Sequence, residues 1–274
     1  MRAEDLRRTP VPELHRLFCD EARDLPSGGL TALKQDPRAG ARAIAGRIEK
    51  RNHEAQAEGR RLTRLSAFEQ PLWEQGIVHV GGCDEVGMAP LAGPVIAAAV
   101  ILRPGTRIKG INDSKQLTPE ERDALEPEIR ACCIAVGLGR AEIQEIDTLN
   151  IYYAGLLALR RAVLALDPQP QYLLVDARRL EGLLMPQQAI IKGDAKSITI
   201  GAASIVAKVH RDRLMAQLDL QYPGYGFASH KGYPTAEHLG ALERLGACDL
   251  HRRSFTPVAK ALGLIPEQQE LFAK

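Results

Sequence analysis

From residue 77 onward, short apolar stretches rich in β-branched residues alternate with longer stretches that have helical spacing. This alternation restricts the fold strongly, because it is typical of an α/β domain with a mixed or partly parallel sheet. Predicted strands cover residues 77–83, 95–102, 132–138, 172–175 and 189–191. Predicted helices cover residues 119–130, 143–166, 195–218, 235–245 and 255–264. We therefore expect a sheet flanked by helices, followed by C-terminal helices.

Acidic residues stand at the ends of three predicted strands. Asp84 and Glu85 follow the first strand, Asp176 ends the fourth and Asp194 follows the fifth. Strand ends that lead into loops are where α/β folds build sites, since rigid backbone there meets solvent. Clustered carboxylates repel one another unless cations lie among them, and oxygen donors without a His or Cys cage favour Mg²⁺ or Mn²⁺. A pair of divalent cations held by carboxylates is a common arrangement for phosphodiester cleavage. The pattern therefore indicates a metal-dependent phosphoryl-transfer enzyme.

The segments around these acids carry groups suited to phosphate. Ser114 and Lys115 lie in a predicted turn that either grips a backbone phosphate or simply precedes the helix at 119–130. Lys196 lies near a glycine at a predicted helix start, where free N–H groups favour anions. Tyr233, in a glycine-rich loop, is either a platform for a sugar or base or a packing residue. The next cations along the helix at 195–218 are expected on a solvated face: Lys208, Arg211 and Arg213.

The first 70 residues differ in charge from the rest. They carry a net charge of +3, whereas residues 71–274 carry −1, and the whole-chain value of +2 neither demands nor excludes a nucleic-acid partner. Asp36 and Pro37 predict a helix start. The apolar stripe of that helix is predicted at Ala41, Ile44, Ile48, Ala55, Leu62 and Leu65. We expect a basic helical extension over residues 1–70, joined through residues 68–76 to a main domain over residues 71–274. A solvated helix and a nucleic-acid contact both remain open for the extension.

The N-terminus lacks the apolar segment of a secretory signal, and the longest apolar run, residues 95–102, is too short to span a bilayer. Five cysteines without CxxC spacing predict free thiols, with Cys132 and Cys133 facing opposite sides of a strand. The expectation is a cytoplasmic protein without a membrane partner. Nothing in the pattern calls for more than a monomer.

Taken together, these segments resemble the ribonuclease HII family, the type 2 ribonucleases H. The resemblance runs in order over residues 77–264. Its motifs are residues 83–94 (CDEVGMAPLAGP), 112–115 (NDSK), 174–176 (LVD), 192–197 (KGDAKS), 202–208 (AASIVAK), 211–213 (RDR), 230–233 (HKGY) and 251–255 (HRRSF). The helical extension also looks like that of longer bacterial members.

The resemblance implies a ribonuclease H-like mixed sheet flanked by helices, with a helical N-terminal extension and C-terminal helices. It implies hydrolysis of the RNA strand of RNA–DNA hybrids and cleavage at ribonucleotides embedded in duplex DNA. The products would carry 3′-hydroxyl and 5′-phosphate ends, and the setting would be DNA replication and repair. The catalytic acids, which would also hold Mg²⁺ or Mn²⁺, are Asp84, Glu85, Asp176 and Asp194. The implied substrate contacts are Gly87, Met88, Ala89, Ser114, Lys115, Lys196 and Tyr233.

One departure concerns recognition of the ribonucleotide. The family has Gly-Arg-Gly, a tripeptide that reads the ribose 2′-hydroxyl, where this chain has Gly87, Met88 and Ala89. Met88 cannot supply the arginine's charge. Ala89 adds a Cβ where glycine serves a positive φ or a close approach to the ligand. We therefore expect cleavage to persist while the preference for a single embedded ribonucleotide weakens.

Two alternatives remain at this stage. A hybrid-binding protein with lost or altered cleavage would fit the departure at Met88 and Ala89, although all four acids are present. The related ribonuclease HIII branch also lacks Gly-Arg-Gly, but it carries a larger N-terminal domain.

Overall fold

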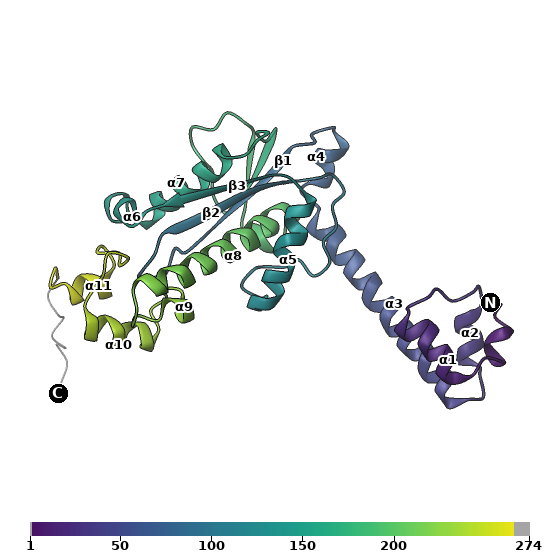
Figure 1. Ribbon diagram of the computed structural model, residues 1–274. Coiled ribbons are helices and arrows are strands. Elements are labelled where there is room, and N and C mark those ends of the chain that lie inside the picture. Colours follow the sequence, from purple (N-terminus) through teal and green to yellow (C-terminus); the bar gives the residue numbers. More distant parts are fainter. Residues whose placement is uncertain (1, 266–274) are drawn as a thin grey trace, which may run out of the picture. The chain divides into compact units, whose positions relative to one another are not determined.

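The structure, a computed structural model, describes residues 2–265 and contains a five-stranded sheet (Figure 1). The strands are β1 (Val80–Val86), β2 (Val95–Leu102), β3 (Cys133–Ala141), β4 (Tyr172–Asp176) and β5 (Gln187–Ile190). Their order is β3-β2-β1-β4-β5. The first three are antiparallel neighbours, whereas β1 runs parallel to β4 and β4 parallel to β5. The predicted mixed sheet is confirmed.

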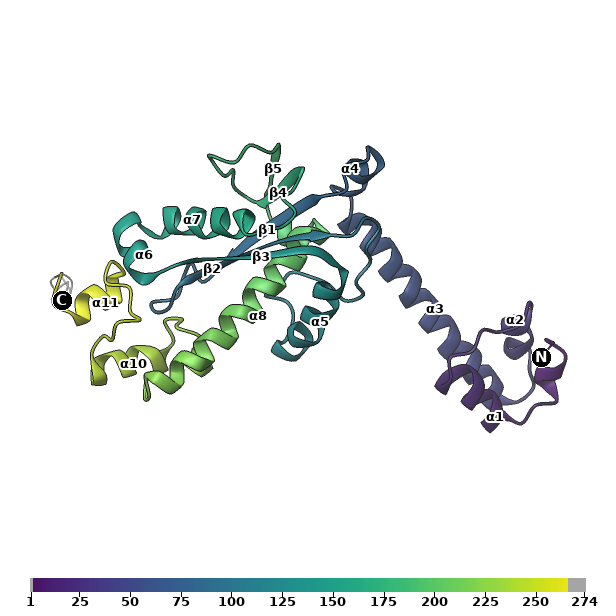
Figure 2. The ribbon, with the colours of Figure 1, turned by 45° about the horizontal axis from the view of Figure 1, so that its top comes forward.

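Two long helices cover the two faces of the sheet, as Figure 2 shows: α7 (Ile151–Leu164) and α8 (Ile198–Gln221). Strand β2 is apolar at every position and fully buried, which suits a strand covered on both sides. Its odd-numbered residues from Val95 to Ile101 pack with the small residues of α7, such as Ala158 and Ala162. The remaining helices of this part are α4 (Gln70–Glu74), α5 (Pro119–Cys132), α6 (Ile143–Leu149), α9 (Phe227–His230), α10 (Ala236–Leu245) and α11 (Thr256–Ala261). Residues 266–274 of the predicted main domain lie outside the described residues.

Several predicted boundaries are wrong. Strand β1 begins three residues later than expected and continues to Val86, so Asp84 and Glu85 lie within the strand. The single helix predicted over 143–166 is two helices, because Asn150 has a φ of 71° and its Oδ1 accepts the Tyr152 and Tyr153 N–H groups to start α7. Cys132 ends α5 while Cys133 begins β3, so the two do not share a strand.

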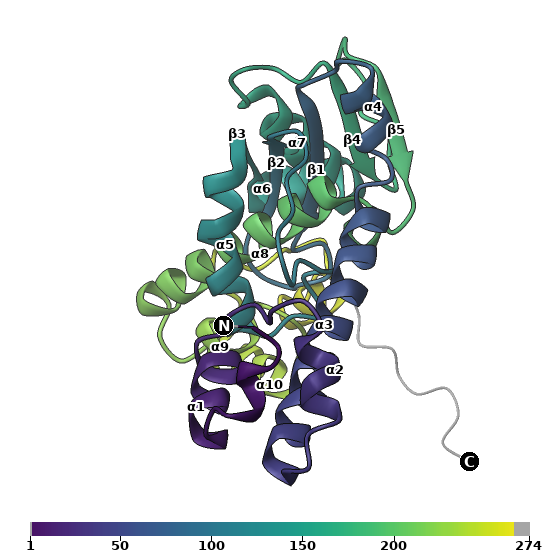
Figure 3. The same cartoon turned by 90° about the vertical axis from the view of Figure 1, so that its right-hand side faces the viewer.

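The predicted connection over residues 68–76 is part of the packed domain. It contains α4, which Figure 3 shows near β4 and β5. Phe68 and Trp73 pack against residues of β1 and β4, including Val80. Glu69 is fully buried. Its Oε1 accepts hydrogen bonds from the Ser197 hydroxyl and, at 3.0 Å, from the Thr199 N–H group, at the start of α8.

The chain divides into two compact units between Thr63 and Arg64, within helix α3 (Ala39–Leu65). The first unit also contains η1 (Asp5–Arg7), α1 (Val11–His15), η2 (Arg16–Asp20) and α2 (Gly29–Lys34). Its own apolar core joins Ile44 and Ile48 of α3 to Leu14 and Leu33. The predicted stripe fails at Ala55, which is exposed.

Asp36 does not cap α3. Its Oδ1 instead accepts the Arg38 N–H group in the preceding turn. Several basic side chains of the extension are bonded within the first unit: Arg38 to the Thr9 carbonyl, Arg42 to the Asp36 carbonyl and Arg51 to the Phe18 carbonyl. Part of its positive charge therefore holds the unit together.

All five cysteines are free, as predicted. Within residues 2–265, no helix has the length and apolarity needed to cross a membrane.

Removing the Glu69 carboxylate should lower the free energy of unfolding by about 1–3 kcal/mol, because Ser197 and Thr199 lose a buried acceptor. Urea denaturation of Glu69→Ala measures this. The matched control is Glu74→Ala, whose carboxylate is exposed and bonded to Gln70. Equal losses in the two variants would contradict the role given to Glu69.

Candidate active site

Asp84 and Asp176 lie at the same level on adjacent parallel strands. In the β1–β4 ladder Cys83 is opposite Val175, so the next residue in each strand is acidic. Side chains alternate along a strand, and Gly82 and Leu174 both face α8. The two carboxylates two residues later are therefore directed to the α8 side of the sheet.

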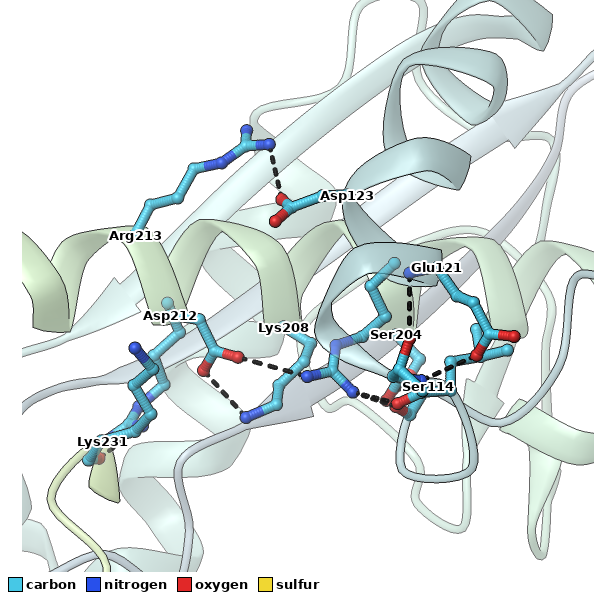
Figure 4. Close-up of polar contacts among 12 residues, drawn as sticks. Ser114, Glu121, Asp123, Ser204, Lys208, Asp212, Arg213 and Lys231 are labelled. Carbon is cyan, nitrogen blue, oxygen red and sulfur yellow. Dashed lines mark hydrogen bonds and ion pairs between the residues drawn. The ribbon is translucent and has the colours of Figure 1, made fainter. Parts of the chain in front are cut away.

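Helix α8 approaches the sheet closely just before these acids. A Cβ on Gly82 would lie 2.5 Å from the carbonyl carbon of Thr199, so glycine is required there. Further along α8, Ser204 hydrogen-bonds Asp84. The Ser204 hydroxyl also lies 2.8 Å from that of Ser114. Both serines are labelled in Figure 4. Ser114, predicted as a phosphate contact, is thus buried and bonded to α8.

Asp194 reaches the same place from a short turn, η3 (Gly193–Ala195), between β5 and α8. The Gly193 N–H group donates to Asp176 Oδ1 at 2.7 Å, which holds the turn against β4. Lys115 Nζ lies 3.5 Å from Asp194 Oδ2, and its side chain is mostly exposed. The structure therefore brings together three of the predicted acids and one lysine: Asp84, Asp176, Asp194 and Lys115. The single positive charge of Lys115 does not balance the negative charges of the three acids.

Glu85 follows Cys83 on the α7 side of β1. Its N–H group donates to Asp84 Oδ1 at 2.8 Å, and its Oε1 lies 3.3 Å from Arg178 Nη2. Its second oxygen, Oε2, is buried and has no hydrogen-bond partner in the described part of the chain. The sequence indicated that Glu85 belongs with the other acids but not that it meets an arginine.

Burial and mutual repulsion dominate the electrostatics of these acids. Burial raises the pKa of Asp84 to about 8, and the charges on Glu85 and Asp176 add to the rise. Burial also raises the pKa of Glu85, against the influence of Arg178. The pKa of Asp176 is raised by burial and by Asp194, although the Gly193 hydrogen bond opposes this. Packing these carboxylates together therefore costs free energy in the folded protein.

The donor set fits a hard divalent cation. Among residues 2–265, no three acidic, histidine or cysteine side chains are already arranged to hold an ion. However, the converging donors are all carboxylate oxygens, which Mg²⁺ and Mn²⁺ prefer. Within the described residues Glu85 Oε2 has no hydrogen-bond partner, and the raised pKa of Asp84 shows that its negative charge is poorly stabilised. Both features favour binding of a positive charge.

Two fully buried arginines hold the loop between β1 and β2, which contains Gly87, Met88 and Ala89. Arg252 donates to the carbonyls of Gly87 at 2.6 Å and Met88 at 3.2 Å. Arg211 donates to the carbonyls at the far end of the loop, Ala92 and Pro94, at 3.1 and 3.2 Å. These interactions fix the backbone that follows Asp84 and Glu85.

The solvated face predicted on α8 is wrong for Arg211 and Lys208. Arg211 is seven residues after the buried Ser204 and so lies on the same helix face, a spacing that could have revealed its burial. Lys208 is half-buried and lies 2.8 Å from Asp212 Oδ1. Arg213 is exposed as expected and pairs with Asp123 at 2.8 Å (Figure 4).

The remaining predicted contacts lie in fixed loops or on the surface. Ala89 is exposed and its φ is not positive, so the loop does not require glycine there for backbone reasons. Lys196 is exposed just after η3. Tyr233 is also partly exposed, and Lys208 Nζ lies 6.0 Å from the centre of its ring.

A histidine cluster that sequence reasoning missed holds the backbone of Tyr233. His238 Nδ1 bonds the Tyr233 carbonyl at 2.9 Å, and its Nε2 lies 3.1 Å from His251 Nε2. His230 stacks on His238 with ring centres 4.4 Å apart. The three imidazoles come from separated segments, so no local sequence pattern predicts the cluster.

The close packing of Gly87 against Arg211 gives a stability prediction. Gly87 has a φ of 92°, and a Cβ there would lie 2.4 Å from Arg211 Nε. Gly76 has a similar φ of 83° but open space around it. In urea denaturation, Gly87→Ala should cost about 1–3 kcal/mol more than Gly76→Ala, because it adds overpacking to the same backbone strain. Equal costs would show that Arg211 does not restrict the loop.

The raised pKa of Asp84 gives a pH prediction. Its unfolded value is near 3.8 and its folded value about 8, so the folded state binds the proton more tightly. The stabilising contribution is fully present below about pH 4 and is lost as the pH rises through 8. Without divalent cations, the free energy of unfolding should therefore fall from pH 5 to pH 8, and less steeply in Asp84→Asn. Parallel slopes in urea denaturation would refute this.

Comparison with known proteins assigns the chain to a family. A sequence model described as Ribonuclease HII matches residues 81–258, and one described as Ribonuclease HII N-terminal domain matches residues 15–73. A ribonuclease HII of Anaeromyxobacter sp. (strain Fw109-5) is 58% identical over 273 residues, covering 100% of this chain and 87% of the relative.

Solved structures have a similar fold. The ribonuclease H2 of Pyrococcus horikoshii OT3 has a TM-score of 0.59 and 26% identity over 68% of this chain and 97% of that one. Bst-RNase HIII in complex with Mn²⁺ has a TM-score of 0.56 and 21% identity over 69% and 70%, and this likeness concerns the fold alone. The family models and the close relative identify the HII branch rather than the HIII branch. The chain belongs to the ribonuclease HII family.

Proposed function

We propose that this protein is an endoribonuclease that hydrolyses the RNA strand of RNA–DNA hybrids and cuts at ribonucleotides embedded in duplex DNA. The observation that carries the proposal is the pairing of Cys83 with Val175, which aligns Asp84 with Asp176. The hydrogen bond from the Gly193 N–H group to Asp176 brings Asp194 beside them. Membership of the ribonuclease HII family supports the choice of substrate. The products carry 3′-hydroxyl and 5′-phosphate ends.

The proposed metal ligands and catalytic acids are Asp84, Glu85, Asp176 and Asp194. When bound, Mg²⁺ or Mn²⁺ would acidify a water molecule and offset the negative charge that develops on the phosphoryl oxygens. The chain itself orients the acids: Ser204 bonds Asp84, the Gly193 N–H group bonds Asp176, and Lys115 lies near Asp194. Lys115 is also placed to pair with a phosphate of the substrate, since most of its side chain is exposed.

The other proposed substrate contacts surround these acids. Gly87, Met88 and Ala89 present backbone groups to the ribose, with their conformation held by Arg252. Lys196 is exposed toward a phosphate backbone, and Tyr233 offers a partly exposed ring for a sugar. Ser114 acts through its bond to Ser204, so it positions Asp84 rather than gripping phosphate by its hydroxyl.

We further propose a division of labour along the chain, with a catalytic domain over residues 71–274 and a basic extension over residues 1–70 that strengthens binding. The protein would act as a cytoplasmic monomer, without a membrane partner, in DNA replication and repair. Exposed basic residues of α3, such as Arg60, suit contact with a phosphate backbone.

Cleavage of a labelled RNA–DNA hybrid in Mg²⁺ tests the activity. Asp84→Asn should lower the rate by at least about 10²-fold, because it removes a carboxylate from the proposed metal site. Asp249→Asn changes an exposed acid and should retain the wild-type rate. If wild type binds the hybrid without cutting it in Mg²⁺ or Mn²⁺, the protein is a hybrid-binding protein instead.

Restoring the family tripeptide tests the role of residues 87–89. The double variant Met88→Arg, Ala89→Gly should raise the rate on a single-ribonucleotide duplex relative to the rate on a full hybrid. The expected rise comes from removal of the Ala89 Cβ, which gives the ribose closer access to the backbone. If the wild-type ratio of the two rates already equals that of the double variant, the departure has no effect on preference.

A further inference from the structure

A positive charge lies beside the uncharged Met88, although it comes from a different segment. A Cβ on Gly155 of α7 would lie 2.9 Å from Arg178 Nη1 and 3.0 Å from both Sδ and Cε of Met88. The guanidinium and the thioether therefore pack over the same point of α7. Arg178 follows Asp176 by two residues, after Ala177 turns the chain with a φ of 51°.

The guanidinium of Arg178 is held between two groups. Its Nη2 lies 3.3 Å from Glu85 Oε1, and its central carbon lies 5.0 Å from the centre of the Tyr152 ring. Tyr152 is in the first turn of α7 and is half-exposed. An arginine that lies over an aromatic ring can still donate its N–H groups in the plane of the guanidinium, so this arrangement presents donors beside the acids.

The hydrogen bonding of this pair is incomplete. Arg178 Nη1 and Glu85 Oε2 are both buried without a hydrogen-bond partner among residues 2–265. Buried polar atoms are nearly always paired, and an arginine beside a carboxylate usually forms two parallel bonds rather than one. The paired side chains thus each keep one unfilled atom, a donor on Arg178 and an acceptor on Glu85, which indicates that a ligand group completes the hydrogen bonding. A phosphate oxygen provides the acceptor that the guanidinium lacks.

Building on the proposed function, we propose that Arg178 contacts a backbone phosphate of the ribonucleotide-containing strand. It thereby supplies the charge that the arginine of Gly-Arg-Gly provides in the family and that Met88 lacks. Tyr152 positions Arg178 by stacking beneath it. Because Arg178 already supplies this charge, Met88→Arg alone should add little to the affinity of the wild-type protein for the duplex. The effect of Ala89 on access to the ribose is a separate matter.

The test is the affinity of the full chain for a single-ribonucleotide duplex in EDTA, measured by fluorescence anisotropy over a range of salt concentrations. Arg178→Ala should weaken binding about tenfold and reduce the slope of log affinity against log salt by about 0.9, the value for one lost phosphate contact. Arg178→Lys keeps the charge and should keep the slope. Adding Met88→Arg to Arg178→Ala should restore it.

Arg179→Ala is the matched control, because it removes the same charge from the next residue, whose side chain is exposed. An unchanged slope in Arg178→Ala, or an equal loss in Arg179→Ala, would overturn the proposal. Failure of Met88→Arg to restore the slope would also overturn it. Cleavage of the hybrid in Mg²⁺ by the same wild-type preparation separates the two claims. Cleavage with an unchanged slope refutes only the role of Arg178, whereas a changed slope without cleavage refutes only the proposed nuclease activity.

Discussion

Repulsion among buried carboxylates is the constraint around which this part of the molecule is built. Parallel pairing of β1 with β4 places Asp84 next to Asp176, and the turn before α8 adds Asp194. Burial removes the solvent that would otherwise screen these charges, which is why the pKa of Asp84 rises to about 8. The nearby cations, Lys115 and Arg178, offset this only in part, because Lys115 is largely exposed and the ion pair of Arg178 with Glu85 is 3.3 Å long. The carboxylates of the site therefore repel one another, and bound divalent cations would reduce this repulsion.

The surrounding structure fixes the loops that lead away from these acids. Arg252 and Arg211 are buried and donate hydrogen bonds to loop carbonyls, so the segment after Glu85 keeps one conformation. His238 does the same for the backbone of Tyr233. A rigid frame of this kind lets a ligand meet groups that are already in place, which lowers the entropy cost of binding. The rigid frame also makes the loop intolerant of substitution, because there is no space for a side chain at Gly87.

Much of the fold followed from local sequence pattern. The fully apolar run of residues 95–102 predicted β2 correctly, and the alternation of strands and helices predicted a mixed sheet. The break at Asn150 was missed because apolar spacing continues across it, whereas the break depends on a positive φ and a side-chain cap. The start of β1 was misplaced because residues 77–79 are as strand-like as those that follow, and only pairing with β4 sets the register.

The site was less accessible to sequence reasoning wherever a role depends on tertiary contacts. The acids could be grouped because each was predicted at or just after a strand end, although Asp84 and Glu85 in fact lie within β1. Helical spacing from Ser204 could have separated the buried Arg211 from the exposed Arg213, but the carbonyls that Arg211 bonds, in the loop between β1 and β2, follow only from the tertiary structure. Likewise, Met88 signals a lost charge in sequence, while the arginine that lies beside it in space, Arg178, is 90 residues away along the chain.

The thermal stability of wild type and Asp84→Asn at pH 8, with and without Mg²⁺, tests the central claim most directly. If the carboxylates repel one another and hold a cation, Asp84→Asn should melt at a higher temperature than wild type in EDTA. Mg²⁺ should then raise the melting temperature of wild type more than that of the variant. A variant that is less stable in EDTA, or that responds to Mg²⁺ as strongly as wild type, would contradict the account.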